Sequence, residues 1–359
     1  MFAIRVVYIF LLSFTKLYCA AKEKGNVTVE NLVKQWSPLI WLAPDEKYMP
    51  LDVEQFLENV DIADENAKII SQSRQLSRFH SKRYNSKKSY LVPSVPLDDL
   101  KTNSSSFLYG KSPKLSPTVP VYAVITYCNH FSKGNVAKSG FNKTKSPLPY
   151  FHVSYWMFYP YNEGKDVCFI GKWPTPLIFS KCFGRYKKMG NHVGDWEHMT
   201  LLFSGKEYPE KLYLSLHDLG AYYTYEKATN TFKFESRLKK EKLAHLSTTK
   251  EFPEYVRLQG GHPVLFAAEG SHGLWAAPGE HEFVRIPSIR DKNGYGTPWK
   301  TWASIKFHHS GRSAPLPWMR FKGRWGSPKS NCVLSRKFGL CELTDGPRGL
   351  LRDDQDFYC

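Results

Sequence analysis

The segment at 190–198, GNHVGDWEH, carries the side chains best suited to chemistry. It places an imidazole at His192 and carboxylates at Asp195 and Glu197. If a strand begins at Asp195, alternation puts both carboxylates on one face and Trp196 on the other, with His192 in the preceding turn. One imidazole with hard oxygen ligands suits Mg²⁺, Ca²⁺ or Mn²⁺, with Zn²⁺ as an alternative. We therefore predict a divalent-cation site, most simply for Mg²⁺ or Ca²⁺; the competing interpretation is a polar strand start that hydrogen-bonds its own turn.

Further histidines lie at the ends of other predicted strands. Glycines around His272 would let the backbone approach a ligand closely and aim the ring. Histidines at several strand ends are typical of a site built on the rim of a sheet, although each alone can equally be an interior or surface residue. The ligand-binding candidates are His217, Glu269, Ser271, His272 and His281.

The motifs of several enzyme classes are absent from the sequence. It has no GxSxG elbow, Walker loop, dinucleotide-binding GxGxxG or HExxH. A metal-dependent hydrolase with His192 or His272 as its base is an alternative, but nothing selects a substrate. We assign no catalytic residue, and the sequence favours a non-enzymatic protein.

The first 21 residues have the pattern of a secretory signal peptide. Arg5 precedes an apolar run at 6–12, and small residues allow cleavage after Ala21. The run ends before Lys16 and is shorter than the ~20 residues that span a bilayer. We therefore expect a protein of the secretory pathway, vacuole or extracellular space and not of the cytosol. Sequons predict N-glycosylation at Asn26, Asn103 and Asn142.

Six cysteines remain once the predicted signal peptide is removed. An even number in an oxidising compartment predicts three disulfides. Spacing favours two local pairs and leaves the first and last cysteines for each other, and the absence of CxxC removes the main support for zinc-ribbon and thioredoxin sites. The predicted pairs are Cys168–Cys182, Cys332–Cys341 and Cys128–Cys359.

Composition favours β-structure. Of 359 residues 15% are aromatic, and there are 24 Gly and 23 Pro, which is typical of many strands and turns. From residue 119 onward, β-branched and aromatic runs alternate with turn signals without intervening helices. We predict an all-β fold, a single antiparallel β-sandwich with short peripheral helices and long loops.

The chain divides into four predicted segments. These are a signal peptide at 1–21, an N-terminal segment at 22–118, the sandwich core at 119–330 and a Cys-containing tail at 331–359. The N-terminal segment is expected to pack on the core through short helices, one of them at 52–60 with Asp52 as its cap. Its run at 36–44 is too rich in proline to be expected as a central strand, and 71–116 is expected to form a basic loop.

The chain is strongly basic, with 50 Lys and Arg against 33 Asp and Glu for a net charge of +17. Such a surface favours an anionic membrane, a glycolipid or an acidic glycan as partner. Nucleic acid is also a polyanion, but an exported chain is not expected to meet it. The sequence leaves the oligomeric state open.

Five blocks of sequence resemble a known family in their order. They are WSPLIWLAPDEKYMP at 36–50, YWMFYPYN at 155–162, NHVGDWEH at 191–198, GSHG at 270–273 and GRWG at 323–326. The chain is similar, over roughly residues 36–328, to the vacuolar protein sorting-associated protein 62 family. The resemblance implies a role in protein traffic to the vacuole, with no established enzymatic activity or ligand.

The segment at 192–197 is also similar to the heptapeptide of necrosis-inducing secreted cytolysins. Those β-sandwich proteins bind a divalent cation and then sphingolipid head groups, which implies that His192, Asp195 and Glu197 are metal ligands or their neighbours. The chain departs from the heptapeptide at Asn191 and Gly194, which argues against cytolysis. The predicted function is a luminal vacuolar-sorting protein with a cation-assisted rim for a glycan or lipid head group. A membrane-active cytolysin and a metal-dependent hydrolase are the alternatives.

Overall fold

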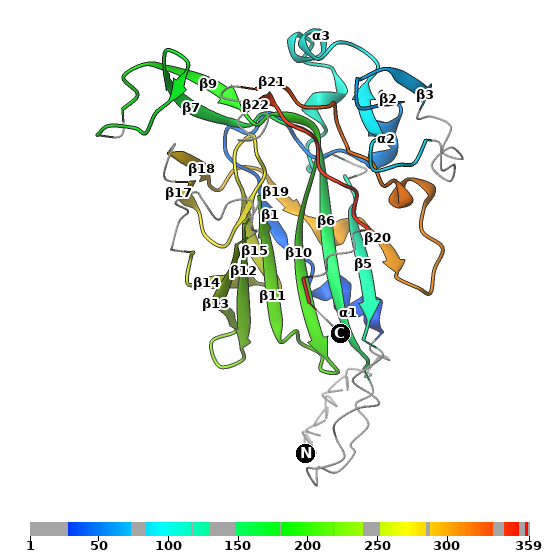
Figure 1. Cartoon of the computed structure of the whole chain (residues 1–359). Coiled ribbons are helices and arrows are strands. Elements are labelled where there is room, and N and C mark those ends of the chain that lie inside the picture. The colour runs from blue at the N-terminus through cyan, green and yellow to red at the C-terminus, as the bar shows by residue number, and fades with distance from the viewer. Residues whose placement is uncertain are drawn as a thin grey trace, which may run out of the picture.

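The computed structural model in Figure 1 describes most of the chain. The predicted signal peptide, the sequons at Asn26 and Asn142, and Cys359 lie outside the described residues. The described residues are 28–72, 84–115, 118–128, 148–179, 181–217, 219–239, 252–284, 288–332, 341–351 and 356–357.

One large sheet of twelve strands dominates the structure. Its strands are antiparallel to their neighbours except for the pairs β1–β15 and β5–β20, which are parallel. The order across the sheet is β19 (Pro298–Lys300), β1 (Leu39–Trp41), β15 (His262–Ala267), β14 (Tyr255–Gln259), β13 (Thr231–Lys239), β12 (Leu219–Glu226), β11 (Lys211–Leu216), β10 (His192–Ser204), β6 (Tyr150–Asn162), β5 (Val121–Tyr127) and β20 (Ile305–His309), with β16 (Leu274–Trp275) paired to β15.

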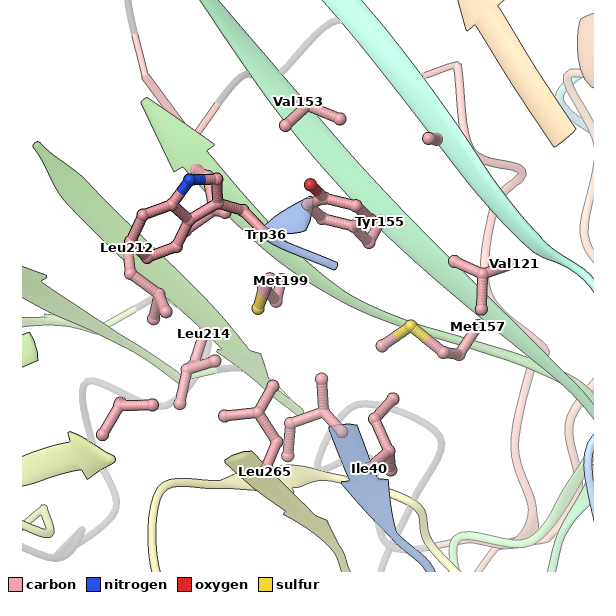
Figure 2. Close-up of a cluster of buried hydrophobic side chains, with 14 of the residues drawn as sticks. Trp36, Ile40, Val121, Val153, Tyr155, Met157, Met199, Leu212, Leu214 and Leu265 are labelled. Atoms are coloured by element: carbon pink, nitrogen blue, oxygen red, sulfur yellow. The ribbon is translucent and has the colours of Figure 1, made fainter. Parts of the chain in front are cut away.

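The sheet curls so that its two ends enclose the main hydrophobic core. Ile40 of β1 and Leu265 of β15 belong to the same buried cluster as Met157 of β6 and Leu214 of β11 (Figure 2). A curled sheet buries apolar side chains on its inner face at every second position. The prediction of a mostly β fold is therefore confirmed, whereas a single sandwich is not, because one continuous sheet supplies both layers.

A second core covers part of the outer face of β5, β6 and β10. Trp196 and Phe158 point into it and meet Trp318 and Trp325 from the C-terminal part of the chain. The covering elements are α2 (Val53–Leu57), η2 (Phe107–Tyr109), η6 (Pro317–Arg320), and a small sheet of β3 (Ile69–Gln72), β2 (Val60–Ala63) and β4 (Tyr90–Pro93), with α3 (Leu97–Thr102) beside them.

Two expectations about the N-terminal segment are wrong. The run at 36–44 does contain an interior strand, β1, because its two prolines, Pro38 and Pro44, flank the hydrogen-bonded residues. The stretch at 71–116 is not one loop, since its described part forms β4, α3 and η2. The Asp52 cap is confirmed by its side chain, which accepts a hydrogen bond from the Glu54 backbone. The helix it caps ends at Leu57, and β2 follows.

Smaller elements complete the fold. Short helices occur at α1 (Val29–Gln35) and η5 (Thr301–Ala303). Three further sheets pair β8 (Trp173–Pro174), β7 (Lys165–Ile170) and β9 (Arg185–Met189), then β17 (Gly279–Val284) with β18 (Ile289–Asn293), and β21 (Ser330–Cys332) with β22 (Cys341–Leu343). Among the described residues, none of the helices has the length and apolar character needed to cross a membrane.

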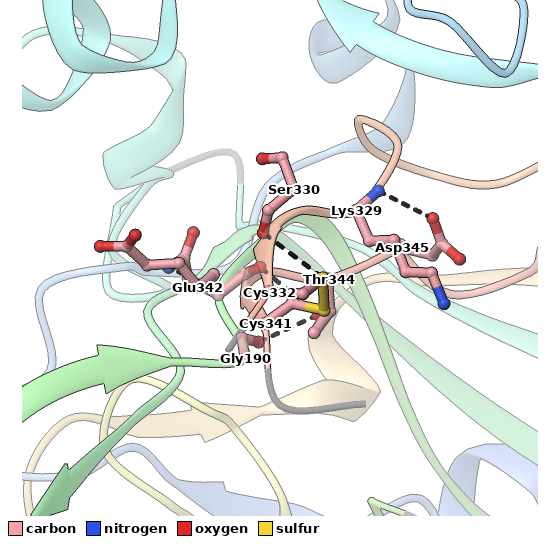
Figure 3. Close-up of a disulfide and its surroundings, with 9 residues drawn as sticks. Gly190, Lys329, Ser330, Cys332, Cys341, Glu342, Thr344 and Asp345 are labelled. Atoms are coloured by element: carbon pink, nitrogen blue, oxygen red, sulfur yellow. Dashed lines mark hydrogen bonds between the residues drawn. A yellow bond between two sulfur atoms is a disulfide. The ribbon is translucent and has the colours of Figure 1, made fainter. Parts of the chain in front are cut away.

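Both local disulfides are confirmed. Cys168 is bonded to Cys182, and Cys332 to Cys341. Figure 3 shows the second of these beside Gly190, whose backbone N–H donates to the carbonyl of Cys341 at 2.8 Å. This contact fastens the C-terminal hairpin to the turn that precedes β10. Cys128 is also disulfide-bonded, and its predicted partner lies outside the described residues.

Candidate functional site

Strand β10 places the predicted acidic pair on the inner face of the large sheet. Asp195 pairs with Tyr159 of β6, and Glu197 pairs with Met157, whose side chains both belong to the main core. Trp196, between them, points outward into the second core. The expected alternation is present, although the strand begins at His192 rather than at Asp195.

Gly194 is the position in this strand that requires glycine. Its φ of +68° lies in the left-handed region, and a Cβ there would be 2.7 Å from the Trp325 carbonyl oxygen. The residue therefore lets the 323–326 segment pack directly on β10. A histidine side chain at this position would not fit.

Asp195 forms a buried ion pair with His272. The Nδ1 atom of His272 lies 3.0 Å from Oδ2 of Asp195, and the same oxygen accepts a hydrogen bond from the Asn162 amide at 2.9 Å. On the other side of the ring, Nε2 is 3.1 Å from the Tyr48 carbonyl and 3.7 Å from Oε1 of Glu46. The ring also stacks on Tyr159, with centroids 3.8 Å apart.

The two carboxylates keep this imidazole charged. Burial acts to lower the pKa of His272, but Glu46 and Asp195 outweigh it and raise the pKa to about 9. Burial likewise acts to raise the pKa of Glu46 and of Asp195, yet the neighbouring His272 leaves both below their usual values. The result is an imidazolium held between two carboxylates in the interior.

A second buried network surrounds Asp291 on β18. Its carboxylate accepts a short contact from Lys165 Nζ at 2.6 Å and hydrogen bonds from His217, Ser271 and Trp275 at 2.8–3.0 Å. Burial acts to raise the pKa of Asp291, but the charges of Lys165 and His217 hold it far below its usual range. Because Ser271 and His272 are adjacent, one loop joins the two networks.

The remaining predicted residues lie around these networks. Nε2 of His192 is 3.9 Å from Oδ1 of Asp195, and its Nδ1 is 2.9 Å from the Gly194 carbonyl. Glu197 is buried. Glu269 has a carboxylate oxygen 4.0 Å from Lys292 Nζ, and His281 stacks on Trp275. Within the described part of the chain, no group of three or more His, Cys, Asp or Glu side chains is arranged to hold a metal ion. The cation site at His192, Asp195 and Glu197 stays a prediction.

Sequence reasoning missed the acidic residues that complete both networks. Glu46 and Asp291 are far in sequence from the histidines that they contact. Glu46 lies within the 36–50 block, which was noted only for its resemblance to a family. A buried carboxylate needs a cationic or donating partner, but sequence spacing alone does not identify which one.

The structure contains a different candidate binding site, a cavity of about 800 Å³ on the outer face of the large sheet. We call it the outer-face cavity. Its floor consists of Val124 on β5, of His152, Ser154 and Trp156 on β6, and of His198 on β10. Its walls are the 310–315 segment that follows β20, Arg320 of η6, and Leu350, Leu351 and Asp356 near the C-terminus. The volume is in the range of small-molecule sites.

One end of the outer-face cavity is acidic, and its carboxylate already accepts hydrogen bonds from the chain. Asp356 accepts hydrogen bonds from His198 at 3.0 Å and from Thr200, both on β10. Burial acts to raise the pKa of Asp356, but the neighbouring His198 contributes to leaving it below its usual value. Tyr222 donates to the Asp356 backbone carbonyl at 3.1 Å and its ring contacts Phe357, so this segment is packed against the sheet.

The other end of the outer-face cavity is basic. His308 on β20 is three strands away from β10, which is about 14 Å at the usual strand spacing. Arg312 and Arg320 line the same end. The guanidinium of Arg312 lies 3.4 Å from the centre of the Tyr127 ring. Among the described residues, neither arginine is in an ion pair with a carboxylate.

The basic end has a positive potential that acts on its own histidine. Burial lowers the pKa of His308, and the positive charges of His309 and Arg320 lower it further. Its Nδ1 is 3.1 Å from the Ser313 hydroxyl. An anion bound among His308, Arg312 and Arg320 would relieve this repulsion.

Comparisons with known proteins find a resemblance to the same family that the sequence blocks resemble. The family model for vacuolar protein sorting-associated protein 62 matches residues 143–241, which include β6 and β10. Two proteins of Saccharomyces cerevisiae are similar to the chain. The "Putative vacuolar protein sorting-associated protein TDA6" is 26% identical over 351 residues, covering 88% of this chain and 64% of its own length. "Vacuolar protein sorting-associated protein 62" is 25% identical over 366 residues, covering 92% of this chain and 66% of its own length.

These alignments confirm the predicted resemblance, and the chain spans about two thirds of the length of each yeast relative. A solved structure, "Crystal structure of Necrosis and Ethylene inducing Protein 2 from the causal agent of cocoa's Witches Broom disease", aligns at 11% identity. The alignment covers 77% of this chain and 72% of that one with a TM-score of 0.27, a likeness too low to carry an argument.

Proposed function

Because the chain is related to the vacuolar protein sorting-associated protein 62 family, we propose that it acts in vacuolar protein sorting by binding a ligand and not by catalysis. The ligand is a phosphorylated polyol, and it binds in the outer-face cavity. The observation that carries this assignment is the pair Arg312 and Arg320, which line the cavity with no carboxylate in an ion pair with either among the described residues.

The basic end of the cavity has the chemistry of a phosphate site. A guanidinium presents parallel N–H donors that match two oxygens of a phosphate. Ser310 and Ser313 line the same region and add polar hydroxyl groups beside His308. A volume of about 800 Å³ exceeds what a phosphate ion needs, so the phosphate carries an organic group.

The opposite end suits hydroxyl groups. The carboxylate of Asp356 and the hydroxyl of Ser154 are acceptors that a ligand hydroxyl can reach. A carboxylate here would repel a second phosphate but accept hydrogen bonds from a polyol. The site is therefore matched to a ligand with one phosphate and several hydroxyls, either a sugar phosphate or an inositol-type lipid head group.

Asp195, His272 and Glu46 resemble an acid–base group more than any other cluster described above. Their burial supports a structural role for them. His272 has no exposed surface, and both of its ring nitrogens have hydrogen-bond partners. Catalysis would need one of these groups to reach a substrate. The two disulfides support a luminal or extracellular location for the chain, since such bonds persist in oxidising compartments.

Deletion of the gene in its own host tests the proposed pathway. We expect vacuolar hydrolases to appear in the culture medium as unprocessed precursors, and re-expression of the chain to restore their delivery. The double variant Arg312→Gln/Arg320→Gln should fail to restore it, whereas Arg257→Gln, which removes an exposed arginine on β14, should restore it. Normal sorting in the deletion strain, or full rescue by the double variant, would contradict the proposal.

Two probes distinguish a glycan from a lipid as the molecule that carries the polyol phosphate. Mannose 6-phosphate in solution represents a glycan, and phosphatidylcholine vesicles containing phosphatidylinositol represent a lipid. Vesicles with an equal mole fraction of phosphatidylserine control for charge. Binding of the sugar phosphate that is lost in Arg312→Gln/Arg320→Gln identifies the glycan, and a phosphatidylinositol preference lost in that variant identifies the lipid. Binding of neither probe overturns the ligand assignment.

A further inference from the structure

The three-stranded sheet of β8, β7 and β9, at 165–189, forms an arm that projects from the body of the structure (Figure 1). We call it the β7–β9 arm. Its strands pair only with each other, apart from contacts at the base. The Cys168–Cys182 disulfide crosslinks it internally.

The outer part of the arm exposes an unusual concentration of large apolar side chains. Among the described residues, sixteen large hydrophobic side chains are exposed, and six of them lie at 170–186. Phe179 is 92% exposed, Phe183 67% and Trp173 66%. The other three are Ile170, Ile178 and Tyr186. A concentration of exposed apolar side chains of this kind is typical of a contact site.

Phe179 is held outward by the backbone at the tip of the arm. Ile178 and Lys181 exchange both backbone hydrogen bonds, at 3.1 and 2.9 Å, and the turn residue Phe179 follows Ile178. Phe179 occupies this turn with φ of +48°, a region that favours glycine or asparagine. A bulky aromatic side chain at such a position costs free energy and gains nothing from internal packing, which indicates a role outside the molecule.

The arm is basic and contains no acidic residue from 167 to 194. Lys172, Lys181 and Arg185 are exposed near its apolar side chains, and none of them is in an ion pair within the described part of the chain. This pattern of aromatic side chains with lysine and arginine matches the interface of an anionic bilayer. There the rings enter the head-group region and the cations meet lipid phosphates.

The base of the arm packs against the body of the structure and forms ion pairs there. Val167, Phe169 and Met189 form a buried cluster with Ile289 of β18 packed against it. Lys165 reaches the buried Asp291, and Lys188 is 3.1 Å from Glu163. These contacts restrict the base of the arm, which lowers the entropic cost of inserting its exposed side chains into a surface.

We propose that the β7–β9 arm is a membrane anchor, in which Trp173, Phe179 and Phe183 insert into the interface of an anionic bilayer and Lys172, Lys181 and Arg185 bind its lipid phosphates. The proposal goes beyond the proposed function because it concerns a second surface, distinct from the outer-face cavity. None of the residues that line the cavity belongs to the arm.

Co-sedimentation of the full chain with vesicles tests the anchor. We expect binding to phosphatidylcholine vesicles that contain phosphatidylserine, and much weaker binding to phosphatidylcholine alone. Trp173→Ser/Phe179→Ser should weaken the partition coefficient by more than roughly tenfold because it removes most of the inserted apolar area. Lys172→Gln/Lys181→Gln/Arg185→Gln should weaken it by about 100-fold at low salt, at about fivefold for each cation.

Matched variants control for general effects on fold and charge. Tyr255→Ser removes an exposed aromatic ring from β14, and Lys227→Gln/Lys233→Gln/Arg257→Gln removes the same charge from exposed positions between β12 and β14. Both controls should bind vesicles like the unaltered chain. Arm variants should have the melting temperature of the unaltered chain and its affinity for mannose 6-phosphate or phosphatidylinositol in the cavity. A failure of the anchor proposal can therefore be told apart from a failure of the proposed function. Equal binding by arm variants and controls, or no binding to anionic vesicles, overturns the anchor.

Discussion

Nδ1 of His272 and Oδ2 of Asp195, which are 77 residues apart in sequence, lie 3.0 Å from each other in the interior. The pair joins the loop after β15, a strand near one end of the curled sheet, to β10, which lies in the middle of the strand order. Because Glu46 lies on the other side of the same ring, the N-terminal segment is fixed to this point as well. Asp195 and His272, which the sequence suggests as binding-site residues, therefore hold distant parts of the fold together.

The charge on His272 predicts a loss of stability in alkaline solution. The folded-state pKa of about 9 lies above the ordinary value of 6.5, so the contribution is fully present below pH 6.5 and is lost as the pH rises through about 9. We expect the free energy of unfolding to fall by about 3 kcal/mol across that interval. Urea denaturation at a series of pH values measures it. His272→Gln should remove most of the slope, and an equal slope in this variant would contradict the assignment.

Removal of the Asp291 carboxylate should be strongly destabilising. Asp291→Ala leaves Lys165 with its buried ammonium uncompensated, and we expect a loss of about 3–5 kcal/mol in the free energy of unfolding. Asp45→Ala, at an exposed ion pair with Lys292, should cost less than about 1 kcal/mol. Chemical denaturation of both variants measures these losses in the free energy of unfolding. A loss for Asp291→Ala no larger than that for Asp45→Ala would be inconsistent with the buried network.

Gly194 and Gly171 form a matched pair for backbone packing. Both have φ near +65°, but a Cβ at Gly194 would meet the Trp325 carbonyl whereas one at Gly171 meets nothing within 4 Å. Gly171→Ala should cost about 1 kcal/mol from the backbone conformation alone. Gly194→Ala should cost about 2–4 kcal/mol, because the steric clash is added to that strain. Similar melting temperatures for the two variants would show that the 323–326 segment does not pack on β10 as described.

Metal content tests the cation site predicted at His192, Asp195 and Glu197. If the site exists, elemental analysis of the purified chain will find about one equivalent of a divalent ion. Asp195→Asn should lose that ion, while Asp166→Asn, at an exposed position on the β7–β9 arm, should retain it. An unaltered chain free of metal, or equal metal in both variants, would refute the site.

Local patterns in the sequence predicted many of the strands, but not the curling of the large sheet into two layers. The alternation of Asp195, Trp196 and Glu197 and the Asp52 cap are local, and both are present in the structure. The strand at 39–41 was missed because its pairing with β15 lies more than 200 residues away in the sequence. The curling of one sheet into two layers depends on such distant pairs, and these leave no periodic signal.

The candidate site was harder to predict for the same reason. The residues flanking His272 and Asp195 in the sequence identify both as candidate site residues. Their direct contact and the part played by the buried Glu46 could not be inferred from spacing. The outer-face cavity was missed because it combines single residues from β20, η6 and the C-terminal segment. Arg312 and Arg320 belong to no motif, and only the folded arrangement places them beside His308.

The most direct test of the outer-face cavity is a calorimetric titration of the full chain with mannose 6-phosphate and, separately, with short-chain phosphatidylinositol below its micelle concentration. We predict saturable binding of at least one of them with one site per chain. The affinity should be weakened by roughly tenfold or more in Arg312→Gln/Arg320→Gln and unchanged in Arg257→Gln. No heat of binding for either compound, or equal affinity in the double variant, would contradict a phosphate site in this cavity.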